Sequence, residues 1–164
     1  MPTYRLSDTV AAMSLAYKAA DQSQSSTIVL LDDTDLQIPV QANTPYLVEI
    51  FLTINNAAGT AGFKFGLAVP SGTTMNGQLC QDSNNDGTLI DGTTRTDLTA
   101  LPALGAARWG SAAVNAGDNR LHFSLIIQTS TTPGLIKCQW AQSVSDAGAT
   151  IVARGSFMRV TRLA

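Results

Sequence analysis

The run Asp82-Ser83-Asn84-Asn85-Asp86-Gly87 has residue types and spacing that match the start of a calcium-binding loop. In such a loop oxygen ligands alternate along the chain, as Asp82, Asn84 and Asp86 do, and a glycine permits the sharp turn. The twelfth position, which needs a bidentate carboxylate, is Thr93 here. We therefore keep these three residues as a weak calcium candidate, favour a polar surface turn, and expect no cofactor or other metal.

Residues for catalysis are sparse. His122 is the only histidine, and it falls on the outward side of a strand pattern over Leu121–Thr129. With no second histidine and no Cys/His cluster it makes a poor metal ligand or general base. The sequence has no G-x-S-x-G turn for a nucleophilic serine, and its single glutamate, Glu49, lies in a strand pattern. We expect no enzyme activity.

The composition limits the classes of partner. Charged residues make up 13% of the chain, against roughly 25% in an ordinary domain, so the surface is uncharged or covered by other subunits. A net charge of −2 without a Lys/Arg cluster predicts no nucleic-acid binding. No stretch approaches the ~18 apolar residues of a membrane span. Cys80 and Cys138 have no diagnostic spacing; we favour free thiols and leave pairing open.

The clearest strand pattern runs from Tyr46 to Asn55. Its even-numbered side chains are all apolar through Ile54, which predicts a face in the core. The odd face, with Leu47, Glu49 and Phe51, is too apolar to lie in free water. A central strand whose second face is covered by a neighbouring subunit explains this pattern.

Similar alternation recurs along the chain and predicts an all-β fold. Short strand patterns are separated by turns rich in Gly, Asn, Asp and Pro, with no βαβ alternation. Between Ser71 and Asn119 the chain makes a long polar excursion, in which we expect short strands near Gln78 to Gln81, Thr88 to Asp91 and Ala107 to Val114. Counting gives about eight strands, which favours a jelly-roll-like antiparallel sandwich.

The first 26 residues differ from the rest. Leu6, Val10, Met13 and Tyr17 recur at spacings of 4, 3 and 4, which predicts a short helix. Asp21 to Ser26 is polar and resembles a linker. We therefore divide the chain into an N-terminal arm, residues 1–26, and a jelly-roll domain, residues 27–164. The apolar stripe of the helix must dock on this domain or on another chain.

Several stretches in order resemble the trimeric jelly-roll virion proteins of tailed bacteriophages, which serve as capsid decoration (cement) proteins or at tail and fibre tips. The similarity spans about Ser26 to the C-terminus. It rests on these stretches: Leu31-Asp32-Asp33-Thr34-Asp35-Leu36, Pro39-Val40, Asn43-Thr44-Pro45-Tyr46, Gly59-Thr60-Ala61-Gly62, Phe63-Lys64-Phe65, Pro70-Ser71-Gly72, Gln139-Trp140-Ala141-Gln142 and Gly155-Ser156-Phe157-Met158-Arg159-Val160-Thr161-Arg162-Leu163. They are fold-forming signatures, and the excursion has no counterpart among them.

The resemblance implies a homotrimer that is made in a host cytoplasm and resides on the capsid surface of the virion. Leu47, Glu49, Phe51 and Phe157 would then lie at the subunit interface. The expected function is capsid decoration, with the major capsid protein as partner. Its anchoring arm is expected to use these residues: Tyr4, Leu6, Val10, Met13 and Tyr17. The alternative is a tail-fibre or minor tail protein whose Ser/Thr/Asn-rich loops contact host surface glycans.

Overall fold

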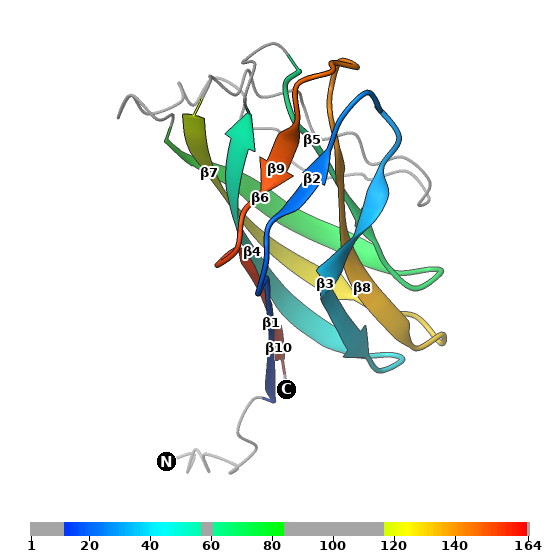
Figure 1. Ribbon diagram of the computed structural model, residues 1–164. Coiled ribbons are helices and arrows are strands. Elements are labelled where there is room, and N and C mark those ends of the chain that lie inside the picture. Colours follow the sequence, from blue (N-terminus) through cyan, green and yellow to red (C-terminus); the bar gives the residue numbers. More distant parts are fainter. Residues whose placement is uncertain (1–11, 57–60, 84–116, 164) are drawn as a thin grey trace, which may run out of the picture.

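The strand with the clearest sequence pattern lies at the centre of the larger of two β-sheets (Figure 1). In the computed structural model, which describes residues 12–56, 61–83 and 117–163, its side chains alternate between half-buried and buried along the whole strand. In chain order the strands are β1 (Met13–Tyr17), β2 (Gln22–Gln24), β3 (Leu31–Val40), β4 (Pro45–Asn56), β5 (Lys64–Ala68), β6 (Thr74–Ser83), β7 (Gly117–Gln128), β8 (Gly134–Ala141), β9 (Thr150–Val152) and β10 (Phe157–Arg162). The described residues contain no helix, which confirms the all-β class.

The strands form two antiparallel sheets. The seven-stranded sheet has the order β1-β10-β4-β7-β6, with β9 also paired to β4 and β2 to β9, and the three-stranded sheet has the order β3-β8-β5. The apolar faces of the two sheets meet, and Phe65 of β5 stacks on Phe123 of β7 with ring centroids 4.2 Å apart. Buried side chains from β3, β4, β7, β8 and β10 complete this core. The result is a sandwich with one hydrophobic core.

The pairing of the strands is nested. The first strand pairs with the last, β2 with β9, β3 with β8, and β4 with β7. The two strands at the centre of this nested order, β5 and β6, do not pair with each other. Instead β5 pairs with β8 in the small sheet and β6 pairs with β7 in the large one. A long hairpin wrapped in this way into two sheets is the jelly-roll arrangement, so the structure agrees with the predicted fold.

The helix prediction is wrong for Met13 and Tyr17. Both residues lie in β1, which pairs with β10 from Met13↔Thr161 to Tyr17↔Phe157. The linker prediction is also wrong for Gln22–Gln24, which forms β2. A spacing of four residues fits a helical stripe, but it also fits two steps of a strand's two-residue repeat. Alanine at positions 11, 12 and 16 then favours the helical interpretation from sequence alone.

The long excursion begins as a regular strand. β6 covers the strand expected near Gln78 to Gln81 and extends it to Ser83. Asp82 lies in β6, whereas Asn84 and Asp86 lie outside the described residues, so the calcium site stays a prediction. The strands expected near 88–91 and 107–114 also lie outside them. Within the part of the chain that the structure covers, no helix has the length and apolar character to cross a membrane.

Candidate interaction surface

The outer face of the seven-stranded sheet carries a row of aromatic rings. Side chains that share a face recur at every second residue, and the registers of three strand pairs place Tyr17 beside Phe157, Phe157 beside Phe51, and Phe51 beside His122. The row therefore crosses β1, β10, β4 and β7. It joins residues that are far apart in the sequence, including Phe51 and Phe157 of the predicted subunit interface.

Three rings of this row, those of His122, Phe51 and Phe157, form a stack. Phe51 and His122 have ring centroids 3.9 Å apart and an interplanar angle of 15°. Phe51 and Phe157 are 4.8 Å apart at 22°. Phe51 thus has a ring on each face, so the row presents ring edges to the outside. A sugar ring stacks on an open aromatic face, so Phe51 is unsuited to that contact, whereas an apolar protein surface packs well on such edges.

The neighbouring row along the same face contains an ion pair. Arg159 lies opposite Leu15 on one side and Glu49 on the other. The Arg159 Nε atom donates a hydrogen bond of 2.8 Å to Glu49 Oε2. Both charges are therefore matched within the subunit, and a partner that covers them need not supply a charge of its own.

Large apolar side chains surround the ion pair and remain open to solvent. The exposed fractions are 60% for Met13, 58% for Leu15, 64% for Tyr17 and 54% for Ile126. We call these four residues, together with Phe51 and Phe157, the sheet-face patch. Monomeric proteins rarely expose a large contiguous apolar patch, so this surface is a candidate docking site.

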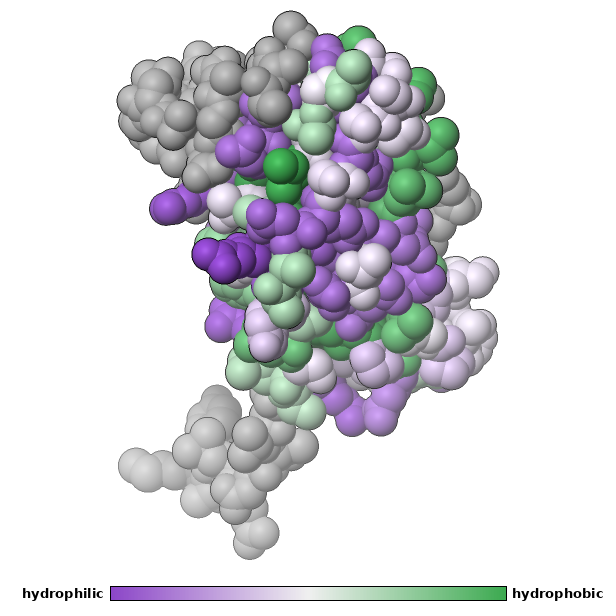
Figure 2. All heavy atoms as spheres, in the orientation of Figure 1, coloured by the Kyte–Doolittle hydropathy of each residue, from purple (hydrophilic) through white to green (hydrophobic). Residues whose placement is uncertain are grey.

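A second apolar group lies on the connection between β2 and β3. Ile28, Val29 and Leu31 are 48%, 61% and 48% exposed, and Figure 2 shows this group at the upper right of the molecule. We call these three residues the connection patch. The connection is held at one end by a 2.7 Å hydrogen bond from the Ser26 N–H to the Asp146 carbonyl and at the other by the pairing of Leu31 with Trp140.

The predicted interface residues are brought together. Leu47 lies between Thr161 and Ile126, in the row of side chains next to the row of the ion pair. The other three predicted interface residues lie on the same face of the sheet: Glu49, Phe51 and Phe157. Met13 and Tyr17, which were assigned to a capsid-anchoring arm, belong to this face as well. Tyr4, Leu6 and Val10 lie outside the described residues, so their anchoring role stays a prediction.

Sequence reasoning missed three parts of this surface. Leu15 was hidden by the helical interpretation, although Met13, Leu15 and Tyr17 follow a strand's two-residue repeat. Ile126 stands out as an apolar residue on the otherwise polar side of β7. The stacking of His122 on Phe51 depends on the register of β4 and β7, which no local pattern reveals.

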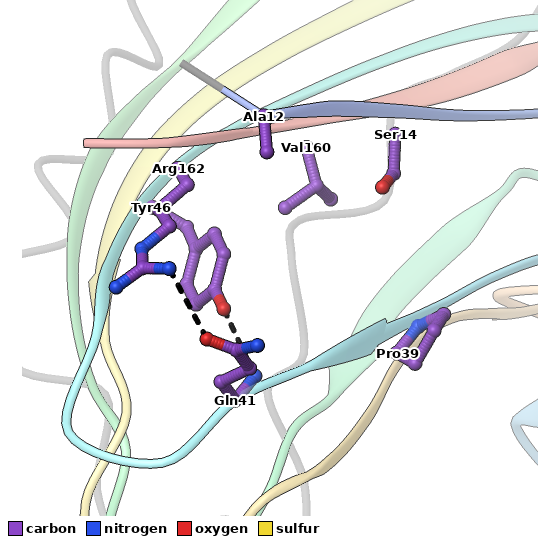
Figure 3. A pocket seen from close by; sticks show the side chains of 7 residues that line it. All are labelled: Ala12, Ser14, Pro39, Gln41, Tyr46, Val160 and Arg162. Carbon is purple, nitrogen blue, oxygen red and sulfur yellow. Dashed lines mark hydrogen bonds between the residues drawn. The ribbon is translucent and has the colours of Figure 1, made fainter. Parts of the chain in front are cut away.

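A shallow pocket lies where the two sheets part beside β1 (Figure 3). It has a volume of about 150 Å³ and is lined by Ala12, Ser14, Pro39, Gln41, Tyr46, Val160 and Arg162. The Gln41 N–H donates to the Tyr46 hydroxyl oxygen at 2.9 Å, and Arg162 donates to the Gln41 side-chain oxygen at 3.3 Å. These polar groups hold the end of the sandwich together and do not form a catalytic set.

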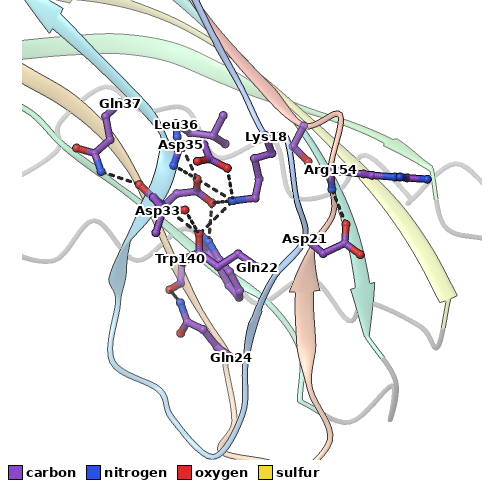
Figure 4. Close-up of polar contacts among 12 residues, drawn as sticks. Lys18, Asp21, Gln22, Gln24, Asp33, Asp35, Leu36, Gln37, Trp140 and Arg154 are labelled. Carbon is purple, nitrogen blue, oxygen red and sulfur yellow. Dashed lines mark hydrogen bonds and ion pairs between the residues drawn. The ribbon is translucent and has the colours of Figure 1, made fainter.

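A buried polar network fastens β1 and β2 to the small sheet (Figure 4). Lys18, at the end of β1, and Asp33, in β3, are both almost completely buried, and the Lys18 Nζ atom lies 3.0 Å from Asp33 Oδ2. Trp140 Nε1 donates to the same oxygen at 3.1 Å, and Gln22 accepts a bond from Lys18 at 3.1 Å. Asp33 turns inward because the register of β3 and β8 shifts between Asp32 and Gln37.

The remaining titratable groups have structural surroundings. Cys138 is a free thiol in the core; burial, and next the charge of Asp33, raise its pKa well above the ordinary value. Hydrogen bonds from Lys137 and then Gln139 lower the pKa of the Asp32 carboxyl. In the described ranges no three His, Cys, Asp or Glu side chains come together as metal ligands would.

No protein-family model matches the chain, and no curated protein matches it. Similar solved structures include that of the infectious bursal disease virus Gt strain, with 10% identity, a TM-score of 0.24, and coverage of 100% of this chain and 43% of that chain. The structure of the Gx strain has 10% identity and a TM-score of 0.24, and the match covers 99% of this chain and 44% of that chain. The crystal structure of the VP2 subviral particle of infectious bursal disease virus has 8% identity and a TM-score of 0.24, and the match covers 99% of this chain and 46% of that chain.

This chain therefore spans less than half the length of those chains. A TM-score of 0.24 is too low to carry an argument about fold or function.

Proposed function

We propose that the protein is a structural, non-enzymatic component of a bacteriophage virion, a decoration protein that binds the outer capsid shell as a homotrimer and stabilises it. The observation that carries this proposal is the sheet-face patch, because a solvent-exposed apolar sheet face on one subunit is a surface that assembly into a trimer would cover. The resemblance to the trimeric jelly-roll virion proteins of tailed bacteriophages, from about Ser26 to the C-terminus, supports the assignment to a virion, and capsid decoration is the function we favour within that family. The major capsid protein is the proposed partner, and the capsid surface the proposed location.

The proposed anchor to the shell is now shorter than the sequence indicated. β1 and β2 belong to the sandwich, so we limit the proposed arm to residues 1–11. Tyr4, Leu6 and Val10 are its apolar members, and they would insert between coat subunits. Among the described residues, β1 begins beside the end of β10 (Figure 1).

The test uses purified shells that lack the protein. We expect the full chain to sediment with the shells and to raise their melting temperature, because a ligand that binds only the assembled state stabilises it. A variant lacking residues 2–11 should keep the melting temperature of the free protein and lose binding to the shells. If the full chain does not bind shells at all, the proposed function is wrong.

The same preparation separates this proposal from the tail-fibre alternative. A tail-fibre or minor tail protein would bind host surface glycans in an array and would leave the shells unchanged. The covered ring faces of Phe51 disfavour glycan stacking on that side chain, and the alternative assigns glycan binding to loops instead. Shell binding without glycan binding is the expected result.

A further inference from the structure

We propose that the sheet-face patch of one copy packs against the connection patch of a second copy, so that three copies close into a ring through head-to-tail contacts. The number of copies rests on the proposed function, whereas the contact follows from the two patches. This contact assigns Met13 and Tyr17 to the subunit interface rather than to the capsid anchor, and it adds Leu15 to the interface.

The pair of patches is what a ring of identical subunits requires. A ring contact is heterologous, which means that each copy must present two different surfaces that fit each other. The sheet-face patch and the connection patch are separate, and both expose large apolar side chains. The charges of Arg159 and Glu49 are already paired within the subunit, so an uncharged partner such as Ile28, Val29 and Leu31 suits the sheet face.

The size of the sheet face fits a subunit contact. Strands about 4.8 Å apart and a rise of about 3.4 Å per residue give a flat footprint of roughly 330 Å² for the five rows of β1, β10, β4 and β7 that carry the sheet-face patch. Projecting side chains make the accessible area larger than this footprint. A stable interface buries about 800 Å² on each partner, so the patch is large enough to be a substantial part of one such contact.

Both patches are held in shape before any partner arrives. At one end of β1 the Arg162 N–H donates to the Ala12 carbonyl at 3.0 Å, and at the other the Lys18 N–H donates to the Ser156 carbonyl at 2.8 Å. The buried Lys18 side chain fixes the same end. The connection patch is anchored through Ser26 and Leu31. Surfaces that are ordered in advance lose little conformational entropy on association, which favours a specific contact.

The test uses exposed residues, so that the fold is unaffected. Leu15→Lys places a charge in the sheet-face patch, and Val29→Lys places one in the connection patch. Leu135→Lys is the matched control, because Leu135 is 42% exposed on the outer face of the small sheet, outside both patches. Mass in solution, measured by light scattering on a sizing column, should show a trimer for the wild type and the control and a monomer for the other two variants.

Mixing the two monomeric variants gives the decisive result. The Val29→Lys copy keeps an intact sheet face and the Leu15→Lys copy an intact connection, so a 1:1 mixture should form a heterodimer that cannot close into a ring. Absence of a heterodimer, a wild type that is monomeric, or a Leu15→Lys or Val29→Lys variant that stays trimeric would each overturn the inference. Thermal melts verify folding, and Ile126→Lys repeats the sheet-face test at a second position.

Failure of this inference and failure of the proposed function give different results. A trimer that forms as described but does not bind shells refutes the function and leaves the contact standing. Variants that stay trimeric but no longer bind shells show that the patches face the capsid, which overturns the contact and leaves the function standing.

Discussion

At the scale of single residues, the buried ion pair between Lys18 and Asp33 should matter most for stability. Lys18→Met leaves the Asp33 carboxylate buried without its cation, which costs about 3–5 kcal/mol in the free energy of unfolding. The control is Lys137→Met, which removes a half-exposed pair with Asp32 and should cost only about 0.2–1 kcal/mol. Urea unfolding measures both. Equal losses would mean that the Lys18 pair contributes no more than a surface pair.

Asp32 should give the protein a small pH-dependent contribution to stability. Its pKa is lowered in the folded protein by hydrogen bonds from Lys137 and Gln139, so its ionised form favours folding. The contribution is present above the unfolded pKa of about 3.9 and is lost as the pH falls through the lower folded value. Asp32→Asn should therefore be less stable than the wild type by about 0.2–1 kcal/mol at pH 7 and equally stable near pH 2. A difference that persists at pH 2 would contradict this.

The thiol of Cys138 should be unreactive in the folded protein. It is buried between the sheets, and burial and the neighbouring Asp33 charge raise its pKa, so it has little of the reactive thiolate form. In a Cys80→Ser background, which leaves Cys138 as the only thiol, iodoacetamide at pH 8 should react roughly a hundredfold more slowly with native than with urea-unfolded protein. Mass spectrometry follows the label. Similar rates in both states would show that the core opens readily at β8.

At the scale of elements, β1 should show hydrogen exchange that alternates along the strand. The bonds at Ala12 and Lys18 indicate that the even-numbered residues of β1 pair with β10. The amides of Ser14 and Ala16 should therefore exchange at least about tenfold more slowly than those of Leu15 and Tyr17, which face the open edge. The measurement uses the Val29→Lys variant, so that no neighbour covers β1. Protection of all four amides would instead indicate a helix.

Elements with long, regular alternation could be predicted from the sequence, and short ones at the edge could not. The pattern from Tyr46 to Asn55 specifies both faces of β4, because a slip of one residue would expose its whole core face. β1 has no such constraint, since its outward side chains are apolar and exposed, while on its other face Ser14 is exposed as well and only Ala16 packs against the core. Its pattern fits a helix as well as a strand, and only pairing with β10 decides between them.

The interaction surface was predictable in part for the same reason. Leu47, Glu49 and Phe51 stand out because a strand face that should meet water is too apolar, whereas Phe157 was assigned to the interface only with the homotrimer that the resemblance implies. The Lys18 and Asp33 pair could not be found in this way, because it joins the end of β1 to a register shift in β3. A lone lysine in an alanine-rich stretch looks like an exposed residue until the topology places it between the sheets.

At the scale of the whole molecule, the proposed ring and the proposed shell contact should reinforce each other. In the proposed ring three arms would act together: once the first arm is bound, the other two would be close to their own sites, at a high effective concentration. The monomeric Val29→Lys variant keeps its arm but has only one, and its affinity for shells should fall by about 10²- to 10⁴-fold relative to the trimer. Titration of immobilised shells measures both affinities.

Leu135→Lys, expected to remain trimeric, controls for the added charge. A second control is the variant lacking residues 2–11, which should remain trimeric and lose binding to the shells, because the ring then has no arms. Equal affinity of the monomer and the trimer would show that each copy binds the shell independently. The ring would then have no part in the stabilisation, and the gain in shell melting temperature would follow occupancy alone.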